Sequence, residues 1–382
     1  MPNKQLFYFT FNDLPGGVYN SQVIEVVNYL NGLNPATKVR LLSIISPRGF
    51  LKNRKQIKAL IPNAVVLPTL APLKYWRVNI LWLFVIRLFS GFSKIICRGP
   101  VATCLSIDAF KDSTVIYDGR GAVVAEQEEY GVYDGSGIEH KLYSIEQKAV
   151  LKSDWCIAVT EQLVQHWQDR FAYRGTQHSV IPCTVSSAKT DKSESIPSSI
   201  ANFIQCMHNK TIFTFAGGNG KWQGIDLLIT FLEEEVKRND NSAALLLTPL
   251  NSELEKLQKK YPHRVHIETV SPEQVHTIIS QCDYGLLLRY PTLTNRVASP
   301  VKVAEYLRAG LKVIISPNIG DYSKLIANTK TGYIWEEGMQ LSLSKIMDAD
   351  REQSRMIVEK YLAKESEDIA EKYMQIIRSV GH

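Results

Sequence analysis

The segment SPVKVAEYLRAG, Ser299–Gly310, combines residue types that suit recognition of a phosphate and a diol. Ser299 is a favourable N-cap and Pro300 a favourable first helical residue, so a helix is predicted to start here. Lys302 then falls in the first turn, where a cation is unfavourable unless a bound anion shares the site. Glu305 follows on the same helix face, and its carboxylate can accept hydrogen bonds from neighbouring hydroxyls. A solvated Lys–Glu pair would explain the same spacing without a ligand.

The loop after the predicted strand 211–216 is a second candidate site for an anion. It places Gly218, Asn219, Gly220 and Lys221 ahead of a predicted helix. Glycines let a ligand approach the backbone, and the helix start offers unpaired N–H groups. The spacing matches neither the P-loop nor the GxGxxG fingerprint. We therefore predict a phosphate cradle that belongs to neither motif.

Glycines also stand before the first predicted helix of the chain. Gly16 and Gly17 follow the apolar run 6–10, and a ligand could approach the backbone there. A turn that requires positive φ would explain the two glycines equally well.

Charged residues end several predicted strands. Arg98 ends one strand of the first half, Asp118 ends the next, and Arg120 follows two residues later. Arg289 ends a strand of the second half. The carboxyl ends of parallel strands present functional groups to ligands, so these residues are candidates for binding. Asp118 as the cap of the following helix is the alternative.

The elements that must position these residues follow from a regular alternation of apolar runs and helical patterns. The runs of the first half are Leu6–Thr10, Lys38–Ile45, Ala64–Pro68, Lys94–Cys97, Thr114–Asp118 and Cys156–Val159. Those of the second half are Thr211–Ala216, Ala243–Thr248, Arg264–Glu268, Tyr284–Leu288, Lys312–Ser316 and Gly332–Trp335. Such alternation predicts an α/β fold with two doubly wound parallel sheets.

The chain length of 382 residues suits two domains. The predicted boundaries are 1–185 for the first Rossmann-like domain, 186–209 for a Ser-rich linker and 210–350 for the second domain. Residues 351–382 are predicted to form a C-terminal helix that packs back toward the first domain.

Composition limits the class of protein. With 45% hydrophobic and 21% charged residues, the chain suits a globular protein and excludes disorder, collagen and coiled coil. The six cysteines include no CxxC pair and no clustered histidines accompany them, so buried thiols are predicted and a metal site is not. The N-terminus lacks the features of a signal peptide, and a cytoplasmic location is expected.

Charge is distributed unevenly. No Asp or Glu stands between Glu25 and Asp108, whereas this stretch contains twelve Lys and Arg residues. Within it, residues 74–89 (KYWRVNILWLFVIRLF) have an apolar core too short to cross a bilayer, which takes about 20 apolar residues. A basic, Trp-bearing helix can instead lie on an anionic membrane surface. A helix packed on the sheet, with solvated basic side chains, is the alternative. Nothing resembles a nucleic-acid recognition motif.

The segment Ser299–Ser316 resembles the donor-nucleotide segment of the large family of retaining GT-B glycosyltransferases that includes sucrose synthases and many bacterial polysaccharide glycosyltransferases. The resemblance also covers the early GG pair, AGGNGKWQGIDLLI, VIPCTV and the C-terminal helix. It implies a GT-B fold of two Rossmann-like domains that face a cleft. The donor, a nucleotide-diphosphate sugar, would bind mainly to the second domain and the acceptor to the first, with no metal and no cofactor.

The resemblance assigns roles to individual residues. Glu305 would hold the ribose hydroxyls, and Lys302 the diphosphate. The expected donor-binding residues are Gly16, Gly17, Gly218, Asn219, Gly220, Arg289, Ser299, Pro300, Val301 and Glu305. The expected catalytic residues are Lys221, Lys302 and Asp118, and the expected acceptor contacts are Arg98 and Arg120.

Three positions depart from the family pattern. Val297 stands where the family usually has a Glu, eight residues before the ribose Glu. Asn219 and Gln223 stand where its loop usually carries Arg and Lys. Other cations must therefore meet the diphosphate, and Lys221, Arg289, Arg296 and Lys302 are the candidates.

The predicted function is transfer of a hexosyl group, with retention, to a hydroxyl of a lipid-linked glycan during synthesis of a cell-surface polysaccharide such as O-antigen, capsule or exopolysaccharide. The chain would act in the cytoplasm, peripherally at the inner face of the membrane. Retention requires no strong protein base, since a departing phosphate oxygen can take the acceptor proton, and a two-carboxylate glycosidase is disfavoured. A sugar-nucleotide epimerase of similar architecture and a non-catalytic GT-B-like partner subunit remain as alternatives.

Overall fold

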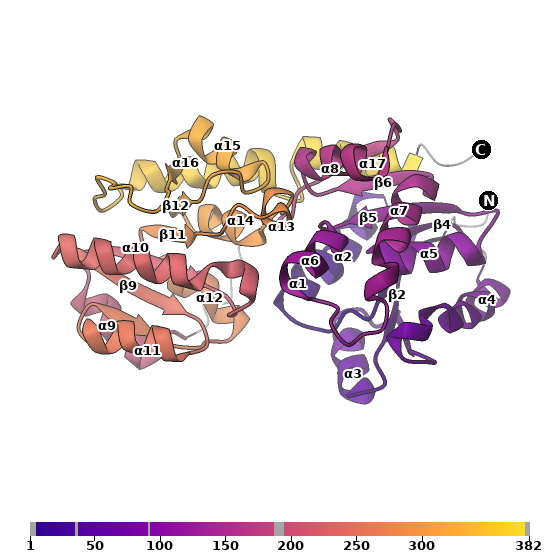
Figure 1. The fold of residues 1–382 in the computed structure, drawn as a ribbon, viewed down its shortest axis with the longest axis horizontal. Coiled ribbons are helices and arrows are strands. Elements are labelled where there is room, and N and C mark those ends of the chain that lie inside the picture. Colours follow the sequence, from indigo (N-terminus) through magenta and orange to yellow (C-terminus); the bar gives the residue numbers. More distant parts are fainter. Residues whose placement is uncertain (1–4, 35–36, 91, 187–194, 379–382) are drawn as a thin grey trace. The chain divides into compact units, whose positions relative to one another are not determined.

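Two parallel β-sheets, each in its own compact unit, organise the chain. The computed structural model describes residues 5–34, 37–90, 92–186 and 195–378. Unit 1 consists of Met1–Thr184 and Glu367–His382, and unit 2 of Val185–Ser366. Strands and helices alternate along both units (Figure 1), which confirms the predicted α/β fold with two Rossmann-like sheets.

Unit 1 is built on a seven-stranded sheet of order β3-β2-β1-β4-β5-β6-β7, in which all neighbouring strands are parallel. Its strands are β1 (Gln5–Phe11), β2 (Lys38–Ile45), β3 (Val65–Pro68), β4 (Phe92–Arg98), β5 (Thr114–Gly119), β6 (Trp155–Ala158) and β7 (His178–Val180). Its helices are α1 (Gly17–Tyr19), η1 (Asn20–Ile24), α2 (Glu25–Leu33), α3 (Phe50–Leu60), η2 (Leu73–Asn79), α4 (Ile80–Phe89), α5 (Pro100–Ala109), α6 (Val123–Tyr130), η3 (Glu139–Lys141), α7 (Leu142–Lys152), α8 (Glu161–Phe171) and α17 (Glu367–Arg378).

Unit 2 is built on a six-stranded parallel sheet of order β10-β9-β8-β11-β12-β13. Its strands are β8 (Thr211–Ala216), β9 (Ser242–Leu247), β10 (Val265–Ile267), β11 (Tyr284–Leu287), β12 (Lys312–Ile315) and β13 (Gly332–Ile334). Its helices are α9 (Ser198–Cys206), η4 (Lys221–Gln223), α10 (Ile225–Arg238), α11 (Ser252–Lys260), α12 (Pro272–Ile279), α13 (Leu293–Arg296), α14 (Val301–Arg308), α15 (Tyr322–Thr329), α16 (Asp348–Ile357) and η5 (Val358–Leu362).

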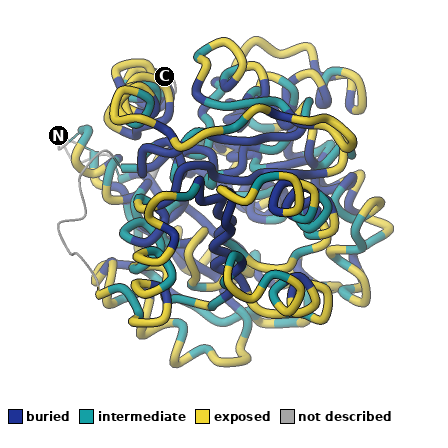
Figure 2. The backbone as a smooth tube through the Cα atoms, turned by 90° about the vertical axis from the view of Figure 1, so that its left-hand side faces the viewer, coloured by how far each residue is buried: buried dark blue, intermediate teal, exposed yellow. Residues whose placement is uncertain are grey.

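The central strands are buried on both faces and form continuous buried stretches inside each unit (Figure 2). In β8, Ile212 and Ala216 face the cluster formed with α12, α14 and α15, whereas Phe213 and Phe215 face the cluster formed with α10 and α11. Successive strand residues point to opposite faces, so helices cover both sides of this sheet.

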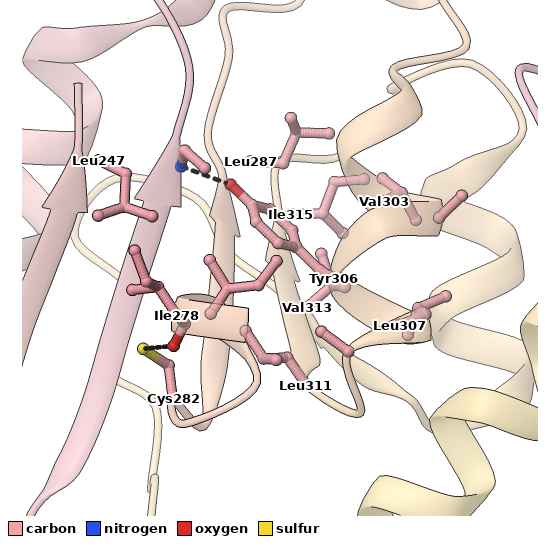
Figure 3. Close-up of a cluster of buried hydrophobic side chains, with 14 of the residues drawn as sticks. Leu247, Ile278, Cys282, Leu287, Val303, Tyr306, Leu307, Leu311, Val313 and Ile315 are labelled. Carbon is pink, nitrogen blue, oxygen red and sulfur yellow. Dashed lines mark hydrogen bonds between the residues drawn. The ribbon is translucent and has the colours of Figure 1, made fainter. Parts of the chain in front are cut away.

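Helix α14 is fixed to the sheet of unit 2 by Tyr306 (Figure 3). The backbone N–H of Ala216, at the end of β8, donates a hydrogen bond of 3.1 Å to the Tyr306 hydroxyl. Gly285 in β11 makes room for the Tyr306 ring, which a side chain at this position would overlap. These contacts hold α14 against β8 and β11.

Several predicted boundaries were wrong. Residues 198–206, predicted as part of the linker 186–209, form α9, because Ile200 is buried in a core cluster of unit 2. Residues 187–194 of that linker lie outside the described residues. The predicted C-terminal helix 351–382 is interrupted, since Val185 pairs with Ala363 and exchanges backbone hydrogen bonds with Leu362 and Lys364.

The cysteines are free thiols, as the sequence predicts, but they differ in burial. Cys97, Cys104, Cys156 and Cys282 are buried, whereas Cys183 is half-buried and Cys206 is exposed on α9. The expectation of burial was therefore wrong for Cys206, which lies on the solvent side of an amphipathic helix.

Candidate functional site

Each sheet has one point at which the chain reverses the direction in which it adds strands. In unit 2, β9 and β10 follow β8 on one side, while β11, β12 and β13 extend the sheet on the other. In unit 1, the corresponding point lies between β1 and β4. Ligands of open parallel sheets bind at such switch points, at the carboxyl ends of the strands.

The start of α14 lies at the switch point of unit 2, one residue later than predicted. The helix begins at Val301 and its N-cap is Pro300, whose ψ of 118° is still extended. Ser299 is therefore not the cap, and its buried hydroxyl donates to the Tyr322 hydroxyl at 3.1 Å. Lys302 lies in the first turn as predicted, and Glu305 lies one turn further along.

Two cations meet at one neutral oxygen beside this helix start. The Lys302 ammonium donates to Oε1 of Gln223 at 2.8 Å, and the Arg289 guanidinium donates to the same oxygen at 3.2 Å. The Lys302 ammonium also lies 4.1 Å from the centre of the Phe215 ring. Positive charge is thus concentrated where β8, β11 and α14 meet, which suits a phosphate group.

The protonation of Lys302 reflects this environment. Burial and, to a smaller extent, the nearby charge of Arg289 together lower its pKa to about 7, although Glu305 opposes the shift. A bound anion would reverse this effect, because it would favour the charged ammonium.

Arg289 is held in place from two sides. Its backbone N–H donates to the Ser316 hydroxyl at 2.9 Å, and its guanidinium donates to Oδ1 of the buried Asn295 at 3.3 Å. The Asn295 amide in turn donates to the carbonyl of Tyr290 at 3.0 Å. This network orients the guanidinium before any ligand arrives.

The residues of the glycine-rich loop of unit 2 have different structural roles. Asn219 uses its side chain within the fold: the amide donates to the Pro249 carbonyl and accepts from the Thr248 hydroxyl, both at 2.9 Å. At Gly218 a side chain would meet nothing within 4 Å, whereas at Gly220 it would overlap Trp222.

Among the four candidate cations, Lys221 and Arg296 are exposed. Of the four candidate cations, Arg289 and Lys302 are therefore the two that hydrogen bonds bring together.

Gly224 closes this loop with a φ of +60°, a left-handed conformation that favours glycine. A side chain there would come within 2.5 Å of the Leu288 carbonyl oxygen. The glycine thus allows the turn that carries Gln223 to lie directly against the end of β11.

The switch point of unit 1 carries the residues expected on the acceptor side. Arg98 ends β4, and its guanidinium lies 3.4 Å from the Asp13 carboxylate. Asp118 is fully buried, and its carboxylate is held by Arg120 at 2.8 Å and by the Tyr8 hydroxyl at 2.6 Å. Asp118 thus orients Arg120, and its direct contact with a substrate stays a prediction.

The early glycine pair lies in the same unit. Gly16 has an extended φ of 174° and Gly17 begins α1, so positive φ does not explain either glycine. Both are exposed, and a side chain at either position would meet nothing within 4 Å. Their role in donor binding stays a prediction.

A pocket of about 270 Å³ opens at the switch point of unit 1. Besides Arg98 and Arg120, it is lined by Asp13, Tyr117 and Glu126. Burial and, to a smaller extent, repulsion from Glu129 together raise the pKa of the Glu126 carboxyl to about 7. Sequence reasoning missed these three residues. Asp13 alone gave a signal, as a carboxylate directly after a strand.

Metal-ligand clusters and membrane-spanning helices are both absent from the described residues. No group of three or more His, Cys, Asp or Glu side chains in this part of the chain is placed to hold a metal ion. No helix in the same residues has the length and apolar character needed to cross a membrane.

Comparisons with known proteins bear on the fold. No protein-family model and no curated protein sequence matches the chain. Among solved structures, sucrose-phosphate synthase from Thermosynechococcus elongatus is similar, with a TM-score of 0.68, 13% identity, and coverage of 98% of this chain and 99% of that one. Anabaena HepE in complex with UDP gives a TM-score of 0.67 at 14% identity, with coverage of 98% and 99%. A glycosyltransferase from Rickettsia africae gives 0.69 at 16% identity, with coverage of 100% and 99%. These likenesses span both units and confirm that each has the Rossmann-like architecture of the GT-B fold.

Proposed function

We propose that this chain is a glycosyltransferase that moves a sugar from a nucleotide-diphosphate sugar, bound by unit 2, to a hydroxyl of an acceptor, bound by unit 1. The observation that carries the proposal is the convergence of Lys302 and Arg289 on Gln223 at the unit 2 switch point. HepE, a protein of similar fold, binds UDP, which supports a nucleotide-containing donor for this chain.

The proposed chemistry follows from this charge arrangement. The bond between the anomeric carbon and the diphosphate breaks, and the diphosphate oxygen keeps the electron pair. Lys302, Arg289 and the first N–H groups of α14 stabilise the negative charge that develops. Glu305, one turn further along α14, would hold the ribose hydroxyls. These groups are fixed in advance, so little reorganisation is needed when charge develops.

The acceptor hydroxyl forms the new bond to the anomeric carbon and gives its proton to a departing phosphate oxygen. This route leads to retention of configuration and requires no strong protein base. In this mechanism Asp118 would orient Arg120 and would not act as a base.

We further propose that the acceptor is lipid-linked and that the chain works at an anionic membrane surface, in polysaccharide synthesis. The support is an exposed apolar stripe on α4, formed by Leu81, Phe84, Val85 and Leu88. These positions follow the i, i+3, i+4, i+7 spacing of one helix face. Exposed basic residues precede it in the sequence, namely Lys52, Arg54, Lys55, Lys74 and Arg77.

Not all of the twelve basic residues contribute to this surface. The Lys94 ammonium is buried and donates to the carbonyl of Ile377, and Arg98 pairs with Asp13. Arg87 is exposed but lies 2.9 Å from Asp112. The charge that attracts anionic lipid would therefore come mainly from η2 and α3.

The fold alone does not separate glycosyl transfer from the two alternatives, an epimerase and a non-catalytic partner subunit. The deciding quantity is the fate of a bound nucleotide sugar. Transfer releases a nucleoside diphosphate, epimerisation changes the sugar without release, and a partner subunit does neither.

The test is thermal unfolding of the whole chain with a panel of UDP, GDP, ADP and dTDP sugars, followed by assay of nucleotide release. A donor present at about 100 times its Kd is expected to stabilise the protein by about 2.7 kcal/mol. Lys302→Ala should weaken its binding by about tenfold or more, since a charge-assisted contact is lost. Lys324→Ala, an exposed lysine of α15, is the matched control. Equal donor binding by wild type and Lys302→Ala would contradict the proposal, as would the absence of binding.

A further inference from the structure

The pocket at the switch point of unit 1 contains buried polar groups that the fold leaves without partners. Tyr117, in β5, is completely buried, and its hydroxyl makes no hydrogen bond. The Nη1 atom of Arg98, at the end of β4, is also buried without a hydrogen-bond partner. Both residues line the pocket.

Such groups are costly to leave unpaired. Native proteins pair nearly all buried polar atoms, and an unpaired one lowers stability unless a ligand or water satisfies it. Two of them in one pocket, at the place where parallel sheets bind ligands, indicate a site that is completed by a ligand.

Glu126 supplies the third element of the site. It lies on α6, lines the same pocket, and its carboxyl makes no hydrogen bond or ion pair with any residue in the described part of the chain. Arg120, in contrast, is already held by Asp118. The groups that a ligand could pair with are therefore a hydroxyl, one guanidinium nitrogen and a carboxyl.

This combination selects the class of ligand. Arg98 can only donate hydrogen bonds, whereas an ionised Glu126 can only accept them. Each hydroxyl of a sugar does both, so adjacent hydroxyls can satisfy the two residues together. A phosphate would accept from Arg98 and from the N-terminus of α5, but it would face the carboxylates of Asp13 and Glu126. The volume of about 270 Å³ is near the lower end for ligand pockets and suits a single ring.

We infer that this pocket binds one glycosyl residue through Tyr117, Arg98 and Glu126. The inference rests on the proposed function for one point: if unit 2 takes the donor, the residue bound here is the terminal sugar of the acceptor. Glu126 and Tyr117 would then select which sugar accepts the transferred group.

The experiment is saturation-transfer NMR on the full chain with methyl glycosides of glucose, galactose, mannose and N-acetylglucosamine, one at a time. The variants are Tyr117→Phe and Glu126→Gln. Glu128→Gln, on the same helix but paired with Arg170 at the surface, is the matched control. We expect wild type and the control to bind at least one glycoside, and both pocket variants to bind it about tenfold more weakly.

Thermal unfolding distinguishes a loss of sugar binding from a loss of stability in the variants. Tyr117→Phe removes a buried hydroxyl that has no partner, so its Tm should equal or exceed that of wild type while sugar binding falls. Binding of a nucleotide sugar to unit 2 should be unchanged in both variants.

Three outcomes would overturn the inference. They are no glycoside signal from wild type, equal signals from wild type and the pocket variants, and displacement of the glycoside by inorganic phosphate. Because donor binding is measured separately, each of them is distinct from failure of the proposed function.

Discussion

At the scale of single residues, the candidate donor site gathers two cations around one neutral oxygen. Gln223 offers this oxygen to Lys302 and Arg289. The positive charge is therefore supplied by a helix start and a strand end. Lys302 acquires a pKa of about 7 there, mainly through burial and secondarily through Arg289.

This pKa predicts that donor binding takes up protons. Above pH 7 the free Lys302 is mostly neutral, whereas the bound diphosphate favours the charged form. Binding must then protonate Lys302, and the affinity should fall by up to about tenfold per pH unit above pH 7. Isothermal titration calorimetry with a nucleotide sugar, in buffers of different ionisation enthalpy, measures this uptake.

Lys302→Arg provides the control for proton uptake. A guanidinium stays charged throughout this pH range, so its donor binding should vary little between pH 7 and 9. The same pH slope in wild type and Lys302→Arg would show that another group takes up the proton.

At the scale of elements, α4 differs from an ordinary covering helix. Leu83 and Ile86 pack into the fold, but Leu81, Phe84 and Leu88 are 55%, 44% and 80% exposed. A helix of a soluble α/β unit normally turns polar residues to solvent, so this second apolar face has no role within unit 1. It is the face through which we propose that the chain attaches to a membrane surface.

Replacing this face should abolish attachment to lipid vesicles. The double substitution Phe84→Ser and Leu88→Ser removes two large apolar side chains, each worth about 1.5–3 kcal/mol when fully buried, so partitioning should fall by about 100-fold or more. Co-sedimentation with vesicles that contain phosphatidylglycerol measures the change.

Two comparisons test the specificity of this attachment. Leu250→Ser, at an exposed leucine of unit 2, should leave sedimentation unchanged. Wild type should prefer anionic over phosphatidylcholine vesicles at low salt and lose that preference as salt screens the charge. Equal binding to both vesicle types would count against an electrostatic contribution.

At the scale of the whole molecule, the chain crosses between its units twice. It leaves unit 1 at Thr184 and returns at Glu367, so that α17 completes a unit whose other elements come from the first half of the sequence. Ile369, Tyr373, Ile376 and Ile377 of α17 belong to the same buried cluster as Leu6 and Tyr8 of β1. The final helix therefore contributes to the core of unit 1.

A cavity in α17 should destabilise unit 1 selectively. Ile376 is fully buried, and Ile376→Ala should cost about 2–5 kcal/mol of unfolding free energy. Hydrogen exchange measured by mass spectrometry should then accelerate in β1, β2 and α2, with β8 and β9 unaffected.

Ile326→Ala is the reciprocal variant, because Ile326 is equally buried but belongs to the core of unit 2. It should accelerate exchange in β8 and β12 and spare β1. Uniform acceleration throughout the chain by either variant would contradict the assignment of α17 to the core of unit 1 alone.

The amino-acid sequence by itself determined the elements. Apolar runs such as 38–45 and 211–216 predicted strands that the structure contains. Pro300 predicted the start of α14 to within one residue. These signals are local, since strand periodicity and helix starts depend on neighbouring residues. The position of Lys302 in the first turn followed from them. The short β7 and the break at 363–366 escaped prediction, because contacts with distant segments fix both.

Only the tertiary structure decided which of these residues meet. Gln223, Arg289 and Lys302 come from three separate elements, and nothing in their spacing distinguishes them from the exposed Lys221 and Arg296. The same holds for Tyr117, Arg98 and Glu126, whose shared pocket and missing partners exist only after β4, β5 and α6 have packed. Burial, and the pKa shifts that follow from it, depend on contacts across the fold. Sequence periodicity therefore predicts where an element lies, while packing decides which charges and hydroxyls that element brings together.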